Sequence, residues 1–378
     1  MKLDQVQEDL FGAIANNENQ APHSMPGWYY SDQRLFELEK TKVFADGWVC
    51  VGHQSEISKI GQYVTATVGD EPIVILRDRQ KKIRAFSNIC RHRGMTLVDG
   101  KGKASLLVCP YHAWSYQLDG QLFKAPYMDA VDGFDPKVCA LPEFKLEVWL
   151  GFMFVNISSL AAPLAPQLVD LEPLLKNYHV EDRHSTQTWY EEWQTNWKAL
   201  VENFMEGYHL PVAHRDTVGG HFPVDKTQFD ERGSFAHFTS QLFVKTGSAP
   251  VGTAHPDNTK LPDDLRNISV MPTVFPCHMY VLAPDHLCYL ALQPDGPGRT
   301  HIRYGAALAP EVLAAQADPQ SYIAGTKAFL DAVQLEDKHM VEGIFAGAMA
   351  PLSSPGPLSW LERENHEFTQ YLARRLCD

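Results

Sequence analysis

Residues 88–120 read NICRHRGMTLVDGKGKASLLVCPYHAWSYQLDG and contain two Cys/His pairs. One residue separates the thiol from the imidazole in Cys90-Arg-His92, and two residues separate them in Cys109-Pro-Tyr-His112. Two Cys and two His in this arrangement can hold a [2Fe–2S] cluster with both His on one iron. A structural zinc site is the alternative, although such sites more often pair Cys with Cys and His with His. We therefore expect two tight loops that present four ligands to one metal centre.

A second group of metal-binding side chains lies further along the chain, in Glu206-Gly-Tyr-His209 and at His214. Two His and a carboxylate suit an open Fe(II) site that reacts with oxygen. Residues 197–210 have helical character, so Glu206 and His209, three positions apart, would share one face of a helix. His214 would lie on another face unless Pro211 breaks the helix and lets the chain turn back. Two unrelated histidines, in a chain that holds 16, are the alternative.

The composition is that of a globular protein with room for two domains. The 378 residues are 44% hydrophobic and 21% charged, with a net charge of −13, and an acidic chain is a poor match for a nucleic-acid partner. The seven cysteines are odd in number and irregularly spaced, which argues against a disulfide framework and for a reducing compartment. The N-terminus lacks the apolar run of a signal peptide, and no segment is apolar over the length of a bilayer. We therefore expect a cytoplasmic protein without a membrane partner.

One segment departs from the acidic balance of the chain. Between residues 77 and 103 the basic side chains greatly outnumber the two acidic ones. They are Arg77, Arg79, Lys81, Lys82, Arg84, Arg91, Arg93, Lys101 and Lys103. This basic island surrounds the first Cys/His pair. It is either a solvated hairpin face or a docking patch for an acidic electron donor, since complementary charge speeds encounter.

The order of strand and helix patterns predicts an α+β protein with two domains. Residues 45–155 predict a small antiparallel β domain, because short β-rich runs alternate with turn residues. These runs are 63–68, 72–76, 83–87, 106–108 and 149–155. Residues 160–166, rich in Ala and Pro, are the expected linker.

Residues 167–378 predict a catalytic domain in which helices flank an antiparallel sheet. Helical periodicity is present at 168–177, 197–210, 322–345 and 358–376. The expected strands are 235–243, 268–274, 279–283, 288–293 and 301–308. Residues 1–44 are expected to form a helical segment that packs on one of the two domains.

The two Cys/His segments resemble the Rieske domain of the Rieske non-haem iron oxygenases, in the terminal oxygenase (alpha) subunit. The resemblance rests on CRHRG at 90–94 and CPYHAWSYQLDG at 109–120. The ligands that it implies are Cys90 and Cys109 on one iron, and His92 and His112 on the other. Ala113 stands where family members usually have Gly, and we expect Ala113 to adopt a negative φ.

The segment NWKALVENFMEGYHLPVAH at 196–214 resembles the catalytic-domain signature of the same family. The resemblance implies that His209 and His214 are two of three ligands on one face of a mononuclear iron. The third ligand would be a carboxylate on the penultimate helix of the chain. We assign Asp337 to this role, with Glu336 as the fallback.

Glu206 has a further role by resemblance. In the family, a carboxylate three residues before the first ligand His accepts hydrogen bonds from that His and from the Rieske His of the neighbouring subunit. Most ring-hydroxylating members have Asp at this position, whereas Glu occurs in members that act on quaternary ammonium compounds. Asn203 and Tyr208 either support this site or pack the helix.

The resemblance covers about residues 40–345 and implies an oxygenase with a Rieske-type [2Fe–2S] cluster and mononuclear Fe(II). A separate reductase or ferredoxin would supply electrons, which would pass through His112 and Glu206 of adjacent subunits in a homotrimer. The leading hypothesis is O2-dependent monooxygenation or demethylation of a quaternary-ammonium or N-methylated polar compound, which aromatic side chains can bind through cation–π contacts. The alternative reaction is cis-dihydroxylation of an aromatic acid. A non-catalytic electron-transfer or zinc protein is the alternative of a different class.

Overall fold

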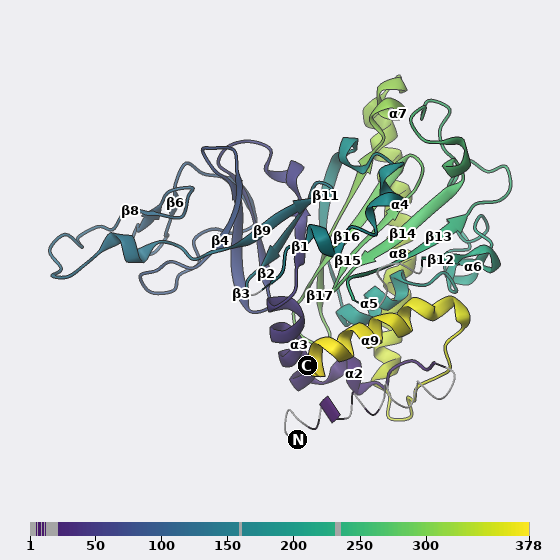
Figure 1. Ribbon diagram of the computed structural model, residues 1–378, viewed down its shortest axis with the longest axis horizontal. Helices are drawn as coiled ribbons and strands as arrows, with labels where there is room; N and C mark the ends of the chain where they lie inside the picture. The colour runs from purple at the N-terminus through teal and green to yellow at the C-terminus, as the bar shows by residue number, and fades with distance from the viewer. Residues whose placement is uncertain are drawn as a thin grey trace. The chain divides into compact units, whose positions relative to one another are not determined.

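The computed structural model describes residues 5, 7, 8, 10, 12, 22–158, 161–230 and 236–377. The chain divides into two compact units. The smaller unit is Phe44–Ala162, and the larger unit combines Met1–Val43 with Pro163–Asp378. Both units contain antiparallel sheets, and the larger one adds helices (Figure 1), which confirms the α+β class. Residue 160 of the expected linker and residue 235 of one expected strand lie outside the described residues.

In the smaller unit the described residues form a seven-stranded antiparallel sheet with the order β1-β10-β9-β4-β3-β2-β5. Its strands are β1 (Val49–His53), β2 (Gln62–Val68), β3 (Glu71–Arg77), β4 (Ile83–Ser87), β5 (Lys101–Lys103), β9 (Glu143–Trp149) and β10 (Phe152–Asn156). A second small sheet contains β6 (Leu107–Val108), β7 (Ser115–Tyr116) and β8 (Leu122–Lys124). Within this unit, β6 and β8 lie at the end remote from β1 (Figure 1).

One predicted strand of the smaller unit is a hairpin. The sequence pattern predicts a single strand over 149–155, but β9 ends at Trp149 and β10 begins at Phe152. Leu150 and Gly151 between them have φ values of 49° and 85°, the left-handed backbone of a two-residue hairpin turn. The prediction is wrong because apolar residues on both sides of the turn give one uninterrupted hydrophobic run.

In the larger unit the described residues form a seven-stranded antiparallel sheet with the order β11-β17-β16-β15-β14-β13-β12. Its strands are β11 (His184–Trp193), β12 (Gln228–Phe229), β13 (Phe238–Val244), β14 (Ile268–Val274), β15 (His278–Leu282), β16 (His286–Pro294) and β17 (Thr300–Leu308). Strands β13 to β17 follow one another as hairpins, and β11 pairs with β17 at the edge. The sequence pattern misses β11 because an edge strand carries many polar residues, here HSTQTWYEEW, and so lacks a clear apolar face.

The larger unit also contains helices, of which α5 and α8 contact strands of this sheet (Figure 1). They are α2 (Trp28–Ser31), α3 (Gln33–Glu39), α4 (Glu172–Lys176), α5 (Trp197–Phe204), α6 (Leu210–Ala213), α7 (Pro310–Ala315), α8 (Pro319–Ala348) and α9 (Arg363–Cys377). Helix α5 contacts α8, α9 and β16, and α8 also contacts β11. Two helix predictions are too long, because 168–177 contains only α4 and 197–210 contains a helix that ends at Phe204. Among the described helices, none has the length and apolarity needed to cross a bilayer.

The first part of the 196–214 segment joins the N-terminal helices to α5. Asn196 caps α5 by accepting the Lys198 amide, and its side-chain amide donates to the Tyr30 carbonyl at 2.8 Å. Lys198 forms a buried ion pair with Glu39 of α3, and the Trp197 indole N–H donates to the other Glu39 oxygen at 2.8 Å. This part of the segment therefore has a packing role, which places the N-terminal helices on the larger unit.

Candidate metal centres

The first Cys/His loop follows β4 in the smaller unit and is closed by two backbone hydrogen bonds. The Cys90 amide donates to the Met95 carbonyl at 2.8 Å, and the Gly94 amide donates to the Cys90 carbonyl at 3.1 Å. Gly94 has a φ of 77°, which Gly adopts without steric cost. The loop thus buries the Cys90 thiol while it exposes His92.

The second loop connects β6 to β7 and repeats the same pattern. The Cys109 amide donates to the Trp114 carbonyl at 2.8 Å, and the Ala113 amide donates to the Cys109 carbonyl at 3.1 Å. Ala113 therefore corresponds to Gly94, and it has a φ of 59°. The prediction of a negative φ at Ala113 is wrong, because the closure of the loop requires left-handed backbone at this position whatever the residue.

This strain leads to a prediction about stability. A left-handed backbone costs an L-residue about 1–2 kcal/mol, so Ala113→Gly is expected to stabilise the smaller unit by about 1 kcal/mol. The midpoint of thermal unfolding, followed by the visible absorption of the cluster, should rise by about 2–4 °C. Gly94→Ala is the matched control, because a Cβ at Gly94 meets no atom within 4 Å and its cost is purely conformational. The account fails if the two substitutions do not shift the midpoint in opposite directions.

The four predicted cluster ligands gather at the ends of these two loops. Cys90 and Cys109 are buried, and burial, aided by the neighbouring Cys109, raises the pKa of the Cys90 thiol. The His92 and His112 rings are exposed, with centroids 4.8 Å apart. His92 stacks on the Trp114 indole at 4.9 Å, which holds the plane of its ring. Two buried thiols beside two exposed imidazoles fit a [2Fe–2S] group with thiolates on one iron and imidazoles on the other.

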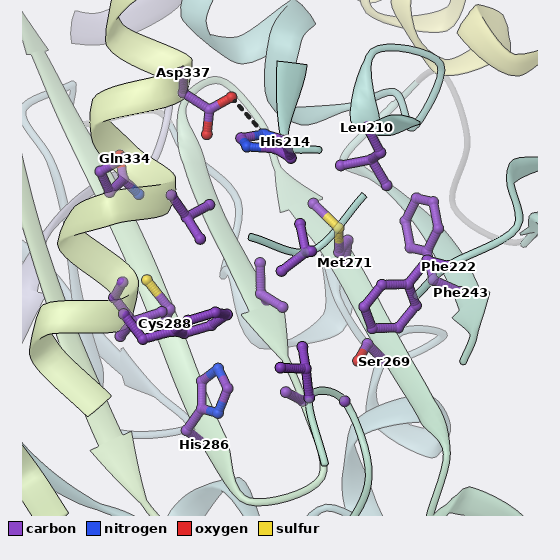
Figure 2. A pocket seen from close by; sticks show the side chains of 18 of the residues that line it. Leu210, His214, Phe222, Phe243, Ser269, Met271, His286, Cys288, Gln334 and Asp337 are labelled. Carbon is purple, nitrogen blue, oxygen red and sulfur yellow. Dashed lines mark ion pairs between the residues drawn. The ribbon is translucent and has the colours of Figure 1, made fainter. Parts of the chain in front are cut away.

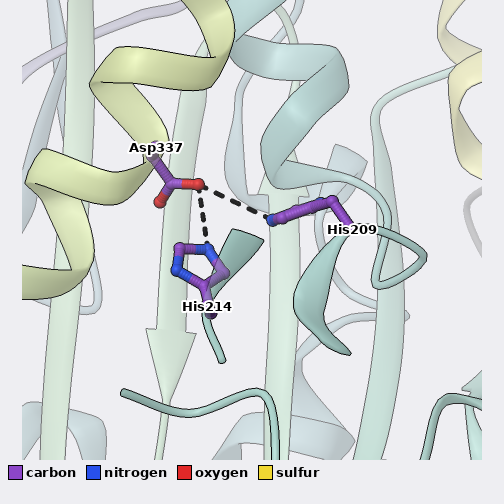
Figure 3. A group of neighbouring side chains, drawn as sticks. All are labelled: His209, His214 and Asp337. Atoms are coloured by element: carbon purple, nitrogen blue, oxygen red, sulfur yellow. Dashed lines mark ion pairs between the residues drawn. The ribbon is translucent and has the colours of Figure 1, made fainter. Parts of the chain in front are cut away.

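In the larger unit the structure brings His209, His214 and Asp337 together (Figure 3). One ligand atom from each lies within 4.8 Å of the others. Asp337 Oδ1 lies 3.0 Å from His214 Nε2 and 3.6 Å from His209 Nε2. Burial raises the pKa of Asp337, but the hydrogen bonds from the two His lower it by a larger amount. The pKa of Asp337 is therefore below its ordinary value. Two imidazoles and a carboxylate that converge on one point fit a mononuclear iron.

Glu206 is positioned differently from the prediction. Helix α5 ends at Phe204, so Glu206 and His209 do not share a helix face. Instead, the Glu206 carboxylate accepts the backbone amides of Tyr208 and His209 and contacts His209 Nδ1. Pro211 does not break the helix either, because it lies in the first turn of α6, where a missing amide costs nothing.

Both histidines of this group have a carboxylate behind the ring. Burial lowers the pKa of His209, but its hydrogen bonds to Asp337 and Glu206 more than offset this effect and raise the pKa to about 10. His214 Nδ1 lies 2.8 Å from Glu336 Oε2, which also accepts the Thr217 hydroxyl at 2.6 Å. Glu336, the fallback ligand, therefore lies behind His214 and outside the group of three. Sequence reasoning missed Thr217, which no spacing distinguishes from an ordinary loop threonine.

The two remaining predicted site residues differ in their placement. The Asn203 side chain donates to Asp337 Oδ1 at 2.9 Å, so Asn203 holds the carboxylate that faces the two His. The Tyr208 side chain is 57% exposed and is absent from the described residues that line the adjoining cavity. Only its backbone amide, bound to Glu206, takes part in the site.

A cavity of about 400 Å³ adjoins the group His209, His214 and Asp337, between the sheet and the helices α5 and α8. Most of its lining is apolar, and Leu210, Phe222, Phe243 and Met271 are among the side chains shown in Figure 2. The α8 residues in the lining are Tyr322, Gly325, Thr326, Phe329, Leu330, Val333, Gln334 and Asp337. A concave apolar site with a few polar groups at a metal-binding group is typical of a small-molecule pocket.

Known protein families match both units. A family model described as the Rieske [2Fe-2S] domain matches residues 47–142, and one described as the ring hydroxylating alpha subunit (catalytic domain) matches residues 180–377. These two domains imply a Rieske-type [2Fe–2S] cluster and a mononuclear iron.

Individual relatives share parts of the chain. The carnitine monooxygenase oxygenase subunit of Escherichia coli (strain K12) is 39% identical over 199 residues, which cover 50% of this chain and 52% of that protein. Chloroplastic choline monooxygenase of Arabidopsis thaliana is 25% identical over 357 residues, covering 91% and 80% of the two chains. The chain spans about half the length of the carnitine and glycine betaine monooxygenase subunits that it matches.

Solved structures extend the similarity over both units. The quaternary ammonium Rieske monooxygenase CntA, crystallised with L-carnitine, gives a TM-score of 0.80 at 27% identity and covers 96% of this chain and 97% of its own. Naphthalene 1,2-dioxygenase from Rhodococcus sp. gives a TM-score of 0.81 at 18% identity over 100% and 99% of the two chains, a likeness of fold alone. With both domains matched in order, the chain belongs to the family of Rieske oxygenase alpha subunits.

Proposed function

We propose that this protein is the terminal oxygenase of a Rieske system and hydroxylates an N-methylated or quaternary-ammonium compound with O2. The observation that carries the proposal is the position of His209, His214 and Asp337 at a largely apolar cavity of about 400 Å³. A metal-binding group that opens into a substrate-sized cavity serves chemistry, whereas a structural zinc site is closed on all sides. When bound, iron at these ligands would supply oxygen activation, and the [2Fe–2S] group would supply electrons.

The substrate class rests on three independent observations. Two of the relatives are named as oxygenase subunits of carnitine monooxygenase and glycine betaine monooxygenase. Glu206 stands at the position where aromatic-ring-hydroxylating members more often have Asp. The cavity lining includes Phe222, Phe243 and Phe329, whose ring faces attract a cation. Hydroxylation of an N-methyl carbon gives an unstable hemiaminal, which releases formaldehyde.

The proposal is tested with purified protein, a surrogate reductase and a panel of choline, glycine betaine, L-carnitine and an aromatic acid. We expect a red-brown protein with about three irons per chain, and oxygen uptake that depends on substrate and matches formaldehyde release. Formation of a cis-diol without formaldehyde would contradict N-demethylation and show that the reaction is dihydroxylation. A colourless zinc protein that consumes no oxygen would remove the oxygenase assignment altogether.

In this proposal Glu206 both orients His209 and relays electrons. Comparing Glu206→Gln with Glu336→Gln shows whether Glu206 has the second function as well as the first. Glu206 and Glu336 each hold the Nδ1 side of one His, but only Glu206 is proposed to relay electrons from the His112 of a neighbouring subunit. Replacing a carboxylate that merely orients a metal-binding His costs about 10–100-fold. We expect Glu206→Gln to lower product formation by more than Glu336→Gln does, while the cluster is still reduced at the normal rate. Equal losses in the two variants would show that Glu206 only orients His209.

We also propose a homotrimer in which each smaller unit contacts the larger unit of the next subunit. The smaller unit exposes large apolar side chains in and around its two Cys/His loops, namely Met95, Val108, Tyr111, Phe123, Tyr127, Val131 and Val138. The larger unit exposes others beside its metal-binding group and on α8, namely Tyr208, Val212, Leu335 and Ile344. Two different apolar surfaces on one chain favour a head-to-tail interface, which closes into a ring.

The proposed electron donor is an acidic reductase or ferredoxin that docks on part of the basic island. Arg77 donates to the Ile57 and Lys81 carbonyls, and Arg84 is paired with Glu143, so these side chains serve the fold. The exposed members outside the two Cys/His loops, which are proposed to face the next subunit, are the best placed for an acidic partner. They are Arg79, Lys81, Lys82, Lys101 and Lys103. A reducing compartment, the cytoplasm, remains the proposed location, on the basis of the odd number of cysteines.

A further inference from the structure

The cavity is elongated, because one helix lines it from end to end. Its α8 residues extend from Tyr322 to Asp337, and a helical segment of this length rises about 22 Å along its axis. The metal-binding group lies at the Asp337 end. In Figure 2, His286 and Ser269 lie at the opposite end of the cavity from Asp337 and His214. A betaine, only a few ångströms long, would fill a small part of this space.

The far end of the cavity contains a carboxylate that the protein holds in place. Asp285 lies in the turn between β15 and β16 and lines the cavity next to His286. Its Oδ2 accepts the His255 backbone amide at 2.7 Å, and its Oδ1 accepts the Asn258 side-chain amide at 3.0 Å. A carboxylate has about four acceptor positions, so Asp285 retains the capacity to accept a donor from a bound molecule.

The far end of the cavity offers little positive charge to a bound anion. Among the described lining residues, none is Lys or Arg, and the His209 and His214 imidazoles lie at the opposite, metal-binding end. Arg183, buried behind this end, donates to the carbonyls of Tyr178, Ala283 and Pro284. These hydrogen bonds use three of its five N–H groups, and Arg183 is not among the described residues that line the cavity.

A second buried cation, Lys245, is also committed to the fold. Its ammonium donates to the Gly247 and Ala249 carbonyls of the loop that leads to the lining residues Pro250 and Val251. His286 does not supply a positive charge either, because burial, with a contribution from Arg183, lowers the pKa of its imidazole to about 4. A carboxylate at this end would lie beside the like charge of Asp285, with no Lys or Arg among the described lining residues, and both conditions disfavour it.

We propose that the substrate is an elongated ammonium compound with an apolar body, whose far end is a second protonated amine bound by Asp285. This inference rests on the proposed function, which places the N-methyl group at the metal-binding end. Carboxylated substrates such as carnitine and glycine betaine would then bind poorly to this chain. Asp285 acts as a specificity-determining residue that takes no part in the chemistry.

The test uses a matched series of decyltrimethylammonium compounds that carry a terminal ammonium, hydroxyl, methyl or carboxylate group. Calorimetry with the iron-loaded protein gives the Kd of each compound, and product analysis gives its turnover. We expect the terminal ammonium to bind most tightly and the carboxylate most weakly. Asp285→Asn should weaken binding of the ammonium compound by about 10–100-fold, the value of a hydrogen bond to a charged group, and leave the methyl compound unchanged. Asp257→Asn is the control, since Asp257 is on the same loop as His255 and its side chain is 52% exposed.

Binding and turnover distinguish this inference from the proposed function. Tightest binding of the carboxylate compound, or equal effects of Asp285→Asn and Asp257→Asn on the ammonium compound, would overturn the role of Asp285. If binding follows the expected order but no compound in the series or the first panel is oxidised, the role of Asp285 holds and the oxygenase proposal fails. If compounds are oxidised without the expected order of Kd, the oxygenase proposal holds and the role of Asp285 fails.

Discussion

Glu39→Ala is expected to destabilise the protein by about 3–5 kcal/mol, the cost of breaking a buried ion pair by removing one partner. Glu39 and the Lys198 side chain are at most 2% exposed. Without Glu39, the Lys198 ammonium would lose its ion-pair partner and keep its contacts with the Tyr29 and Trp197 rings, 4.6 Å and 5.6 Å from the ring centroids. The Trp197 indole N–H would lose the Glu39 oxygen as its acceptor. The measurement is the denaturant midpoint of the far-UV circular dichroism signal.

Two further variants show whether the ion pair is the cause. Glu37→Ala, two residues earlier on α3, removes a side chain that is 52% exposed and should change stability by less than about 0.5 kcal/mol. Glu39→Met combined with Lys198→Met should recover most of the loss, because apolar replacement of a whole buried pair is often neutral. A double variant as unstable as Glu39→Ala would show that Glu39 stabilises the fold through Trp197 alone.

The largest expected effect on activity is that of Asp337→Ala. Asp337 Oδ1 is the oxygen that faces both His209 and His214, so its removal leaves two neutral ligands and no negative charge for a divalent metal. The loss of product formation should exceed the roughly 10–100-fold seen when a residue that supports a ligand is replaced. Iron content should fall from about three to about two per chain, with the visible spectrum of the cluster unchanged.

Leu335→Ala is the matched control for Asp337→Ala. Leu335 is two residues earlier on α8 and is 69% exposed, so the iron content of Leu335→Ala should be that of the unaltered protein. Full iron content in Asp337→Ala would return the third-ligand role to Glu336. Loss of the cluster spectrum in the same variant would instead indicate general unfolding.

The parts of the protein that sequence could predict are those determined by short-range patterns. Both Cys/His loops are closed by hydrogen bonds within six residues, so spacing alone identifies them as tight loops that carry candidate metal ligands. The φ of Ala113 shows the limit of this reasoning. An Ala suggests ordinary backbone, but the geometry of loop closure overrides the preference of the residue.

The end of α5 could not be predicted, because a side chain determines it. Gly207 and Pro211 both disfavour a helix, but α5 ends before either of them, and Glu is a good helix former. Yet Glu206 accepts the amides of Tyr208 and His209, a local alternative to the helical hydrogen bonds. The choice between Glu336 and Asp337 likewise required the structure, since the two are adjacent in sequence and face different sides of His214.

Because α8 lines the cavity over its whole length, different residues of this helix determine the accepted substrate length and the metal-binding group. Successive turns of this helix line the cavity at steps of about 5.4 Å, and Asp337 occupies only the last of them. A Cβ at Gly325 would meet no atom within 4 Å, so a larger side chain there would shorten the cavity without disturbing the backbone. Mutations along this one helix can therefore retune which chain lengths are accepted, turn by turn, while the reactive end stays the same.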